Sequence, residues 1–478
     1  MTRPLAAGFV ALAIAAALPG CASSSTTRPT ATAASLVPSD VIAFVSYASD
    51  PPSSQRSALT TALTPNGGPR PTFAAARSQL LAGIGKPLGI DVGKDVAPWA
   101  TGDIALAVLR DRQAVLVATV GNDSKAAAAL GASRLAHRRI GRREVMAKRV
   151  AALDELPKGG EARLSDTYRY ARAVAAAPGE RLGVGMVDAN ACRRGAGGRF
   201  DFSVRAAARA VEIDGIASGT VATAATGPPT ATDHLPVDTL ASLTTFDGRA
   251  INDVADAALG CVPSASSTPS IATVVSTGLP PGAPANFGID IDGDVMPWLR
   301  GETVISLGPP RSPVAVADVG FVTHPGDLGR AGNALTKIEN MLALTGQFQW
   351  VSRDQAGVNF LSVPQSIAGV PGLQPSVAIA GGRVLLASSP EYLLALANPK
   401  QPTIGSSSSY QDDVAQPHGQ VLGRVVLHLA AMRDLFGGKL PLLATIADPL
   451  IARADTVVLT LAREQSVSRF RLLVRYAS

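Results

Sequence analysis

The hydrophobic pattern changes twice along the chain. A short charged start, Met1–Pro4, leads into residues 5–18, the apolar run LAAGFVALAIAAAL. This run is shorter than the roughly 20 apolar residues that a helix needs to span a bilayer, and it has the length of an export-signal core. From about residue 36 onward, short β-rich runs alternate with stretches whose apolar residues recur at helical spacing. The pattern therefore predicts a leader segment followed by a folded chain of strands and helices.

Two long stretches of the chain predict the same series of elements. In each stretch a turn signal with proline and aspartate precedes a β-rich run, and a helical stripe follows it. Two further strands then precede a helix that an aspartate opens, and a segment that begins with tyrosine comes later. The paired segments are 41–47 with 239–246, 73–84 with 251–259, 104–109 with 303–307, 114–120 with 314–322, the helices after Asp123 and Asp327, and the runs from Tyr168 and Tyr410.

One phrase occurs in both stretches almost unchanged. GIDVGKDVAPW, Gly89–Trp99, returns as GIDIDGDVMPW, Gly288–Trp298. With the shared order of elements, it predicts two tandem duplicated units, residues 36–226 and 235–478, joined by a Pro-rich linker at 227–234. Because the strands come in hairpin-like pairs with helices between them, we expect an α+β fold. Each unit is then a mostly antiparallel sheet with helices packed on one side.

The aspartates of the repeated phrase resemble a calcium loop. The second copy spaces three aspartates around Gly293, but an EF-hand loop needs glycine at its sixth position and a bidentate glutamate at its twelfth. The first copy has Gly93 and Lys94 in place of Asp292 and Gly293, which removes a ligand and adds a positive charge. We therefore expect no metal and a structural role, in which prolines fix turns, tryptophans cover the sheet end and aspartates cap backbone amides. These residues are Asp91, Asp95, Pro98, Trp99, Asp290, Asp294, Pro297 and Trp298.

The apolar run ends in a cysteine motif, Leu18-Pro19-Gly20-Cys21. A small residue before a cysteine at this place resembles the lipobox of bacterial lipoproteins. The resemblance implies that residues 1–20 are a signal peptide and that Cys21 carries a diacylglyceryl anchor with acyl chains such as palmitate. Two such chains hold a protein stably at a membrane. The alternative is an ordinary secreted protein that is cut nearby, with Cys21 lost or free.

The segment after this cysteine fits the same interpretation. Residues 21–35 are small and polar, so we expect a flexible tether there. No second long apolar run follows. We therefore expect an exported protein that is lipid-anchored at the outer face of the cell membrane or elsewhere in the cell envelope.

The other two cysteines and the net charge add two expectations. With Cys21 acylated, Cys192 and Cys261 remain, and two cysteines in an exported protein suggest a disulfide bond. The alternative is a pair of buried free thiols. The formal net charge of +6 is a mild bias for 478 residues, so we expect no nucleic-acid partner.

One strongly basic stretch stands out. Residues 134–149, RLAHRRIGRREVMAKR, hold seven Lys or Arg against one Glu. A basic patch gains roughly 1 kcal/mol per charge near an anionic membrane, so lipid headgroups or wall polymers are candidate contacts. The alternative is a solvated strand–turn–strand edge that uses charge to prevent aggregation. The candidate contact residues are Arg138, Arg139, Arg142 and Arg143.

The chain shows no catalytic signature. It has no Gly-x-Ser-x-Gly, no Walker loop and no His-Glu-x-x-His, and its five histidines are scattered. We therefore expect a non-enzymatic protein without catalytic residues and without a cofactor. The histidines are His137, His234, His324, His418 and His428.

Several motifs together resemble a known family. Val37-Pro38-Ser39-Asp40 and Leu235-Pro236-Val237-Asp238 open the two units, the repeated phrase follows in each, and residues 382–388 read GRVLLAS. Exported bacterial proteins grouped as domain of unknown function thirty-three fifty-two have such strand starts and phrases. The resemblance covers nearly the whole mature chain. It implies an exported, often membrane-attached protein without established function, and it brings no catalytic residues.

Two roles are consistent with this reading. The first is a lipid-anchored, non-enzymatic binding or scaffold protein of the cell envelope, whose partner is a protein, a wall polymer or a lipid. The second is an extracytoplasmic carrier whose sheets and helices enclose a lipid or another hydrophobic ligand. A large apolar cavity would favour the carrier, and tightly filled units would favour the scaffold.

Overall fold

The structure is a computed structural model, and most of the folded chain is described in it. The described residues are 32–64, 68–81, 84–176, 180–188, 191, 198–207, 209–218, 225–247, 293, 296–311, 315, 317–344, 349–364, 372–398, 402–414, 419–436, 453–465 and 467–476.

A large antiparallel sheet dominates the fold, and the described residues contribute 18 strands to it. The predicted α+β class with a mostly antiparallel sheet is confirmed. The strands are β1 (Ala43–Ala48), β2 (Ala100–Val108), β3 (Ala114–Val120), β4 (Ala136–Ile140), β5 (Arg143–Ala147), β6 (Gly183–Asp188), β7 (Arg199–Ala207), β8 (Ala210–Ser218), β9 (Ala241–Asp247), β10 (Arg300–Gly308), β11 (Asp318–Thr323), β12 (Val351–Gln355), β13 (Val358–Ser362), β14 (Ser376–Ala380), β15 (Arg383–Ala387), β16 (Gln420–His428), β17 (Ala454–Glu464) and β18 (Val467–Tyr476).

Helices and short helical turns connect the strands. Those in the described part of the chain are η1 (Ala33–Leu36), α2 (Ser53–Ala62), α3 (Phe73–Leu81), η2 (Lys86–Leu88), η3 (Val92–Val96), α4 (Asp123–Ala132), α5 (Val150–Asp154), η4 (Leu164–Asp166), α6 (Tyr168–Ala175), α7 (Thr230–Asp233), η8 (Met296–Leu299), α11 (Leu328–Leu344), α12 (Pro390–Ala397), η9 (Ile404–Ser406), α13 (Ser408–Val414) and α14 (Leu429–Phe436).

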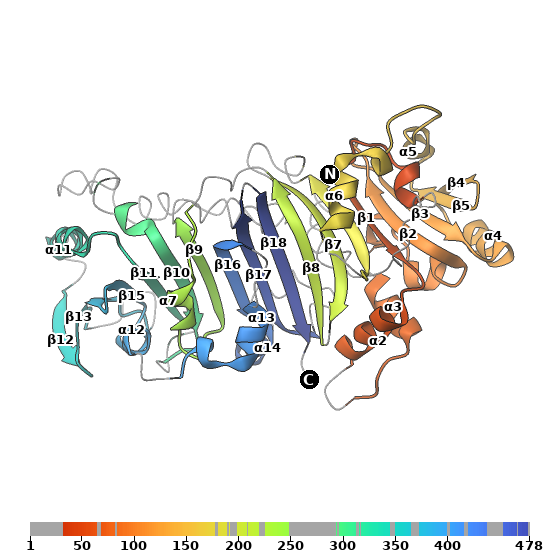
Figure 1. The fold of residues 1–478 in the computed structure, drawn as a ribbon. Coiled ribbons are helices and arrows are strands. Elements are labelled where there is room, and N and C mark those ends of the chain that lie inside the picture. The colour runs from red at the N-terminus through yellow and green to blue at the C-terminus, as the bar shows by residue number, and fades with distance from the viewer. Residues whose placement is uncertain are drawn as a thin grey trace.

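Strand pairing runs without a break from one end of the molecule to the other. In the first half the spatial order is β4-β5-β3-β2-β1-β6-β7-β8. In the second half it is β12-β13-β14-β15-β11-β10-β9-β16-β17-β18. β8 pairs with β18 and joins the halves. The result is an elongated body with β4 and β5 at one end and β12 and β13 at the other (Figure 1).

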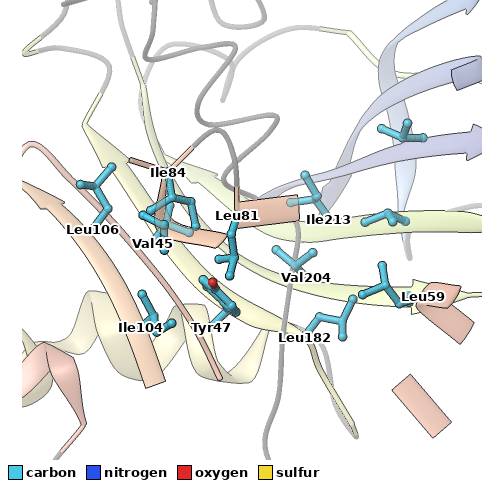
Figure 2. Packing of buried hydrophobic residues seen from close by; sticks show 14 of the residues in the cluster. Val45, Tyr47, Leu59, Leu81, Ile84, Ile104, Leu106, Leu182, Val204 and Ile213 are labelled. Atoms are coloured by element: carbon cyan, nitrogen blue, oxygen red, sulfur yellow. The ribbon is translucent and has the colours of Figure 1, made fainter. Parts of the chain in front are cut away.

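Helices cover both faces of the first half of the sheet, so the prediction of helices on one side is wrong. Ile104 and Leu106 of β2 belong to the apolar cluster that α2 and α3 cover. The neighbouring Ala105 and Ala107 point the other way, into the cluster that α5 and α6 cover. Figure 2 shows the first cluster, where Leu81 lies beside residues of β1 and β2.

The second half is covered on both faces as well. Val384 and Leu385 are neighbours in β15 and point to opposite faces of the sheet. Val384 packs with Trp298 and α11, and Leu385 packs with α12. Strands that are buried on both faces are apolar almost throughout, and β3, whose sequence is AVLVATV, shows that composition.

The last residues of the predicted flexible tether lie in the described structure. Ala33 and Ala34 are fully buried in η1, and the N–H of Ala33 donates to the Asp103 carboxylate. The tether prediction is therefore wrong for Ala33 and Ala34, because their small side chains pack in the cluster that includes Ala105 and Ala107 of β2. The earlier part of the tether, with Cys21, lies outside the described residues.

The predicted linker, residues 227–234, contains α7. Ala231 and Thr232 are buried, and both donate their N–H groups to the Glu302 carboxylate, at 2.8 and 3.2 Å. A carboxylate at a helix N-terminus satisfies amides that lack partners within the helix. The linker is therefore packed onto β10 rather than extended. No helix among the described residues has the length and apolarity to cross a membrane.

Candidate functional site

The first copy of the repeated phrase forms a compact turn beside the sheet. The Asp91 side chain accepts the N–H of Lys94 at 3.2 Å, and the Asp95 carboxylate accepts the N–H of Asp91 at 3.0 Å. Trp99 is buried, and its indole Nε1 donates to the Asp95 carbonyl oxygen at 2.6 Å. Pro98 is exposed in the turn before β2. The phrase thus closes on itself through backbone caps and one aromatic anchor.

A close helix contact accounts for a difference between the two copies. A Cβ atom on Gly93 would lie 2.3 Å from the Ser78 Oγ atom and 3.0 Å from its Cα atom. α3 therefore approaches η3 too closely for any side chain at this position. This close approach favours glycine at the position where the second copy has Asp292.

The second copy is described only in part. Pro297 and Trp298 lie in η8, and the buried Trp298 accepts the Thr323 hydroxyl at its carbonyl oxygen. Its indole Nε1 has no hydrogen-bond partner among the described residues. Asp290 and Asp294 lie outside the described residues, so the geometry of the cap can be followed in the first copy alone.

A pocket of about 440 Å³ opens beside the first phrase. Its walls come from η2, η3 and the last turn of α4, with one residue from β5. Most of the lining is apolar, while Lys94, Asp95, Ser133 and Arg134 supply polar groups. The lining residues are Leu88, Gly89, Ile90, Lys94, Asp95, Val96, Trp99, Ala129, Leu130, Ala132, Ser133, Arg134, Leu135 and Met146.

The basic stretch forms the β4–β5 hairpin, which ends one side of the sheet. Within the described residues β4 pairs with β5 alone. Arg138 pairs with Asp154 at 2.7 Å, and Arg139 pairs with Asp123 at 2.8 Å. Arg143 lies 3.7 Å from Asp103, and Arg142 is exposed. Local carboxylates therefore neutralise three of the four arginines, which leaves less charge for an anionic surface than the sequence suggests.

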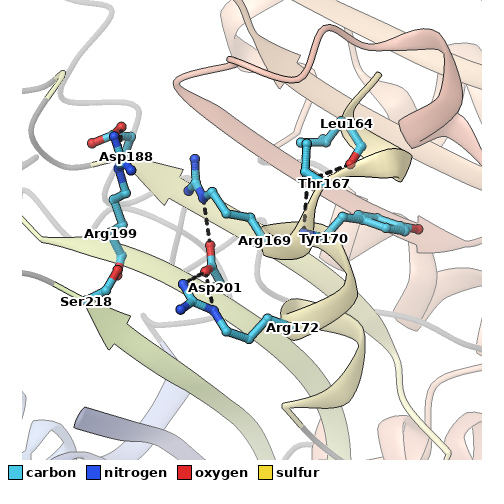
Figure 3. A network of polar contacts seen from close by, with 9 residues as sticks. All are labelled: Leu164, Thr167, Arg169, Tyr170, Arg172, Asp188, Arg199, Asp201 and Ser218. Carbon is cyan, nitrogen blue, oxygen red and sulfur yellow. Dashed lines mark hydrogen bonds and ion pairs between the residues drawn. The ribbon is translucent and has the colours of Figure 1, made fainter. Parts of the chain in front are cut away.

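A buried carboxylate ties α6 to the sheet (Figure 3). Asp201 of β7 has no exposed surface. Its carboxylate accepts hydrogen bonds from the Nε atoms of Arg169 at 3.1 Å and Arg172 at 2.9 Å. The two arginines are three residues apart, so they lie on the same side of α6. The Thr167 hydroxyl caps the helix by accepting the N–H of Tyr170 at 3.2 Å. This cluster is a structural clamp, because one buried carboxylate of β7 holds two side chains of α6.

A second buried charge lies in the other half. Arg424 of β16 is fully buried, and its Nη1 donates to the Tyr410 hydroxyl at 3.3 Å. Tyr410 in turn donates to the Asp233 carboxylate at 3.0 Å. Burial raises the pKa of Tyr410, so the phenol stays neutral. Its hydroxyl bridges the Arg424 guanidinium and the Asp233 carboxylate. The chain of contacts joins β16, α13 and α7.

Burial also shifts the pKa of two other groups in the second half of the molecule. It raises the pKa of Asp413 to about 6, against the opposing effect of the Arg475 guanidinium. It lowers the pKa of His428, whose Nδ1 lies 3.4 Å from the Thr456 hydroxyl. Within the described residues no group of three or more His, Cys, Asp or Glu side chains gathers to hold a metal ion.

The buried ionic clusters were not predicted from the sequence. The spacing of Arg169 and Arg172 is the one available signal, since it places two cations on one side of a helix. Arg424 stands in an apolar strand without a nearby partner in sequence. The predicted disulfide partners, Cys192 and Cys261, lie outside the described residues.

Comparison with known proteins gives one match. A family model described as "Protein of unknown function (DUF3352)" matches residues 205–476, from the end of β7 to the end of β18. No curated protein and no solved structure matches the chain.

Proposed function

Since this chain belongs to the DUF3352 family, whose function is unknown, we propose its role from its architecture: a lipid-anchored, non-enzymatic scaffold or binding protein of the cell envelope. The observation that carries the proposal is the continuous sheet. β8 and β18 pair along eight consecutive residue pairs, from Ala210–Arg475 to Ala217–Ser468. An unbroken ladder with packed helices on both faces makes an elongated and rigid surface, which suits the display of binding sites.

The packing of α2 and α3 against the sheet favours a scaffold over a carrier. A carrier of the kind considered above would enclose its ligand between helices and sheet. Leu59 of α2 and Leu81 of α3 are fully buried in the cluster that includes Val45, Tyr47 and Ile104 of the sheet. Side chains of the protein therefore occupy this layer, as in an ordinary core.

We also propose that the chain arose by tandem duplication. The two halves pair their strands in the same order around a central strand. β1 lies between β2 and β6, and β9 lies between β10 and β16. In each half the next strands outward are β3 then β5, or β11 then β15. The shared phrase falls just before β2 and β10, which supports the same correspondence.

The anchor in this proposal is an acylated Cys21. Ala33 is the first residue of η1, so eleven residues separate it from Cys21. A chain reaches at most about 3.6 Å per residue, so such a segment would hold the sheet within roughly 40 Å of the membrane. Protein or wall-polymer partners in the envelope lie within that range.

Replacing the cysteine tests the anchor. We expect the wild-type chain to sediment with the membrane fraction and to incorporate labelled palmitate in its native type of host, a bacterium. We expect Cys21→Ala to lose the label, because alanine has no thiol to carry an acyl chain. Cys192→Ala is the matched control and should behave as wild type. An unlabelled wild-type chain in the soluble fraction would contradict the anchor.

A further inference from the structure

We propose that the pocket beside the first phrase binds a small anionic amphiphile, a molecule with one anionic group on an apolar body. The pocket lies between η2, η3 and the end of α4, and it is separate from the buried ionic clusters. The inference concerns the folded chain alone and does not depend on the anchor at Cys21.

The walls of the pocket match an apolar body. Val96, Leu130 and Met146 are buried there, whereas Ile90 and Leu135 are only half-buried and face the recess. A ligand that covers the exposed apolar surface of such a pocket gains binding free energy, because it removes that surface from water.

The pocket is held open by contacts of the phrase itself. The Trp99 ring is fixed, since its Nε1 donates to the Asp95 carbonyl oxygen and its side chain is buried in the core cluster. The Asp91 cap on Lys94 and the Asp95 cap on Asp91 fix the neighbouring backbone. The wall is therefore already formed without a ligand, and binding costs little conformational entropy there.

The charges at the pocket select an anion. Lys94 and Arg134 are exposed among the lining residues, and within the described part of the chain neither forms an ion pair. Asp95 is the one acidic lining residue, and its carboxylate already accepts the Asp91 N–H. Two available cations against one engaged carboxylate favour a carboxylate or another single anionic group on the ligand.

The size of the pocket limits the ligand. Its volume of about 440 Å³ lies in the lower part of the range of roughly 300–1,000 Å³ that small-molecule sites occupy. A single medium-length acyl chain or one aromatic body suits this volume. We therefore take decanoate as the probe.

Calorimetric titration of decanoate tests the site. The Cys21→Ala chain, recovered without detergent, is titrated with decanoate, decanol and decyltrimethylammonium. We expect saturable one-to-one binding of decanoate, weaker binding of decanol and no detectable binding of the cation. The double variant Lys94→Glu, Arg134→Glu should weaken decanoate binding by about tenfold or more, with an unchanged melting temperature.

Two further variants separate the pocket from nonspecific effects. Ala129→Trp places a large ring among the lining residues and should abolish binding. Lys125→Glu changes an exposed cation on the same helix that does not line the pocket, and should leave binding unchanged. The proposal is overturned if decanoate fails to bind at millimolar concentration, if binding survives the charge reversal, or if decyltrimethylammonium binds equally well.

Discussion

Trp99 fixes the first phrase against the sheet through both its ring and its indole N–H. The ring is 2 % exposed and belongs to the largest apolar cluster, while the N–H bonds the Asp95 carbonyl oxygen. The neighbouring Asp91 and Asp95 side chains accept the backbone N–H groups of Lys94 and Asp91. The first phrase therefore has a structural role, in which its aspartates accept hydrogen bonds from the backbone of the same turn.

The tryptophans of the repeated phrase should contribute strongly to stability. We expect Trp99→Ala to lower the free energy of unfolding by about 3–5 kcal/mol, because it removes a large buried ring and leaves a cavity. Trp298, at 5 % exposure, should behave similarly. Thermal melts of both variants check this. Val150→Ala, at a side chain 60 % exposed, is the control and should shift stability by less than about 0.5 kcal/mol. Unchanged melting temperatures in both tryptophan variants would refute the structural role.

At the scale of elements, α6 is attached to the sheet by an apolar contact with β1 and by ion pairs with β7. Tyr170 packs edge-on against Phe44 with ring centroids 6.2 Å apart, and Arg169 and Arg172 bond Asp201. Breaking a fully buried ion pair lowers the stability of the fold strongly, because the charge that remains is buried without a partner.

Removing the charge of Asp201 should loosen this helix. We expect Asp201→Asn to destabilise the fold by about 3–5 kcal/mol, because two partly buried guanidinium groups lose their shared counterion. Asp154→Asn offers a matched control, since Asp154 also pairs with an arginine but its side chain is 57 % exposed, and its loss should cost about 0–1 kcal/mol. Chemical denaturation of the two variants measures the difference. Equal stability of the two variants would argue against the clamp.

Local signals predicted the elements well, and distant contacts were missed. The strand at 114–120 and the helix after Asp123 follow from residue type and spacing, although Asn122 rather than Asp123 caps that helix. The same strand is apolar at nearly every position, which is typical of burial on both faces, so its composition argues against helices on one side alone. Asp201 and its arginines lie 29 and 32 residues apart, and no spacing rule connects them.

At the scale of the whole molecule, the pairing of β8 with β18 joins the two halves into one elongated sheet. We call this pair of strands the seam. On one face Phe470 packs edge-on against Phe200, with ring centroids 5.5 Å apart. On the other face Arg471 of β18 pairs with Glu212 of β8 at 2.7 Å. Gly215 lies opposite Phe470, and a Cβ atom there would come within 2.5 Å of the ring. The seam is thus built from side chains on both faces as well as from the backbone ladder.

The sequence predicts two separate units joined by a linker, because the same order of elements is predicted in each half. Pairing of the last strand of each half depends on contacts more than 250 residues apart, such as Glu212 with Arg471. The register of such a pair is set by the apolar and charged positions of both strands together. Neither strand alone carries that information.

Hydrogen exchange of the backbone amides at this seam tests the central claim, a single rigid sheet. The chain is exchanged in D₂O, and peptides from β8 and β18 are compared with peptides from β7 and β17. We predict that the seam amides are as strongly protected as those of the flanking strands, because the ladder is continuous and covered. Rapid exchange of β8 and β18, with β7 and β17 still protected, would show two separate bodies and contradict the account.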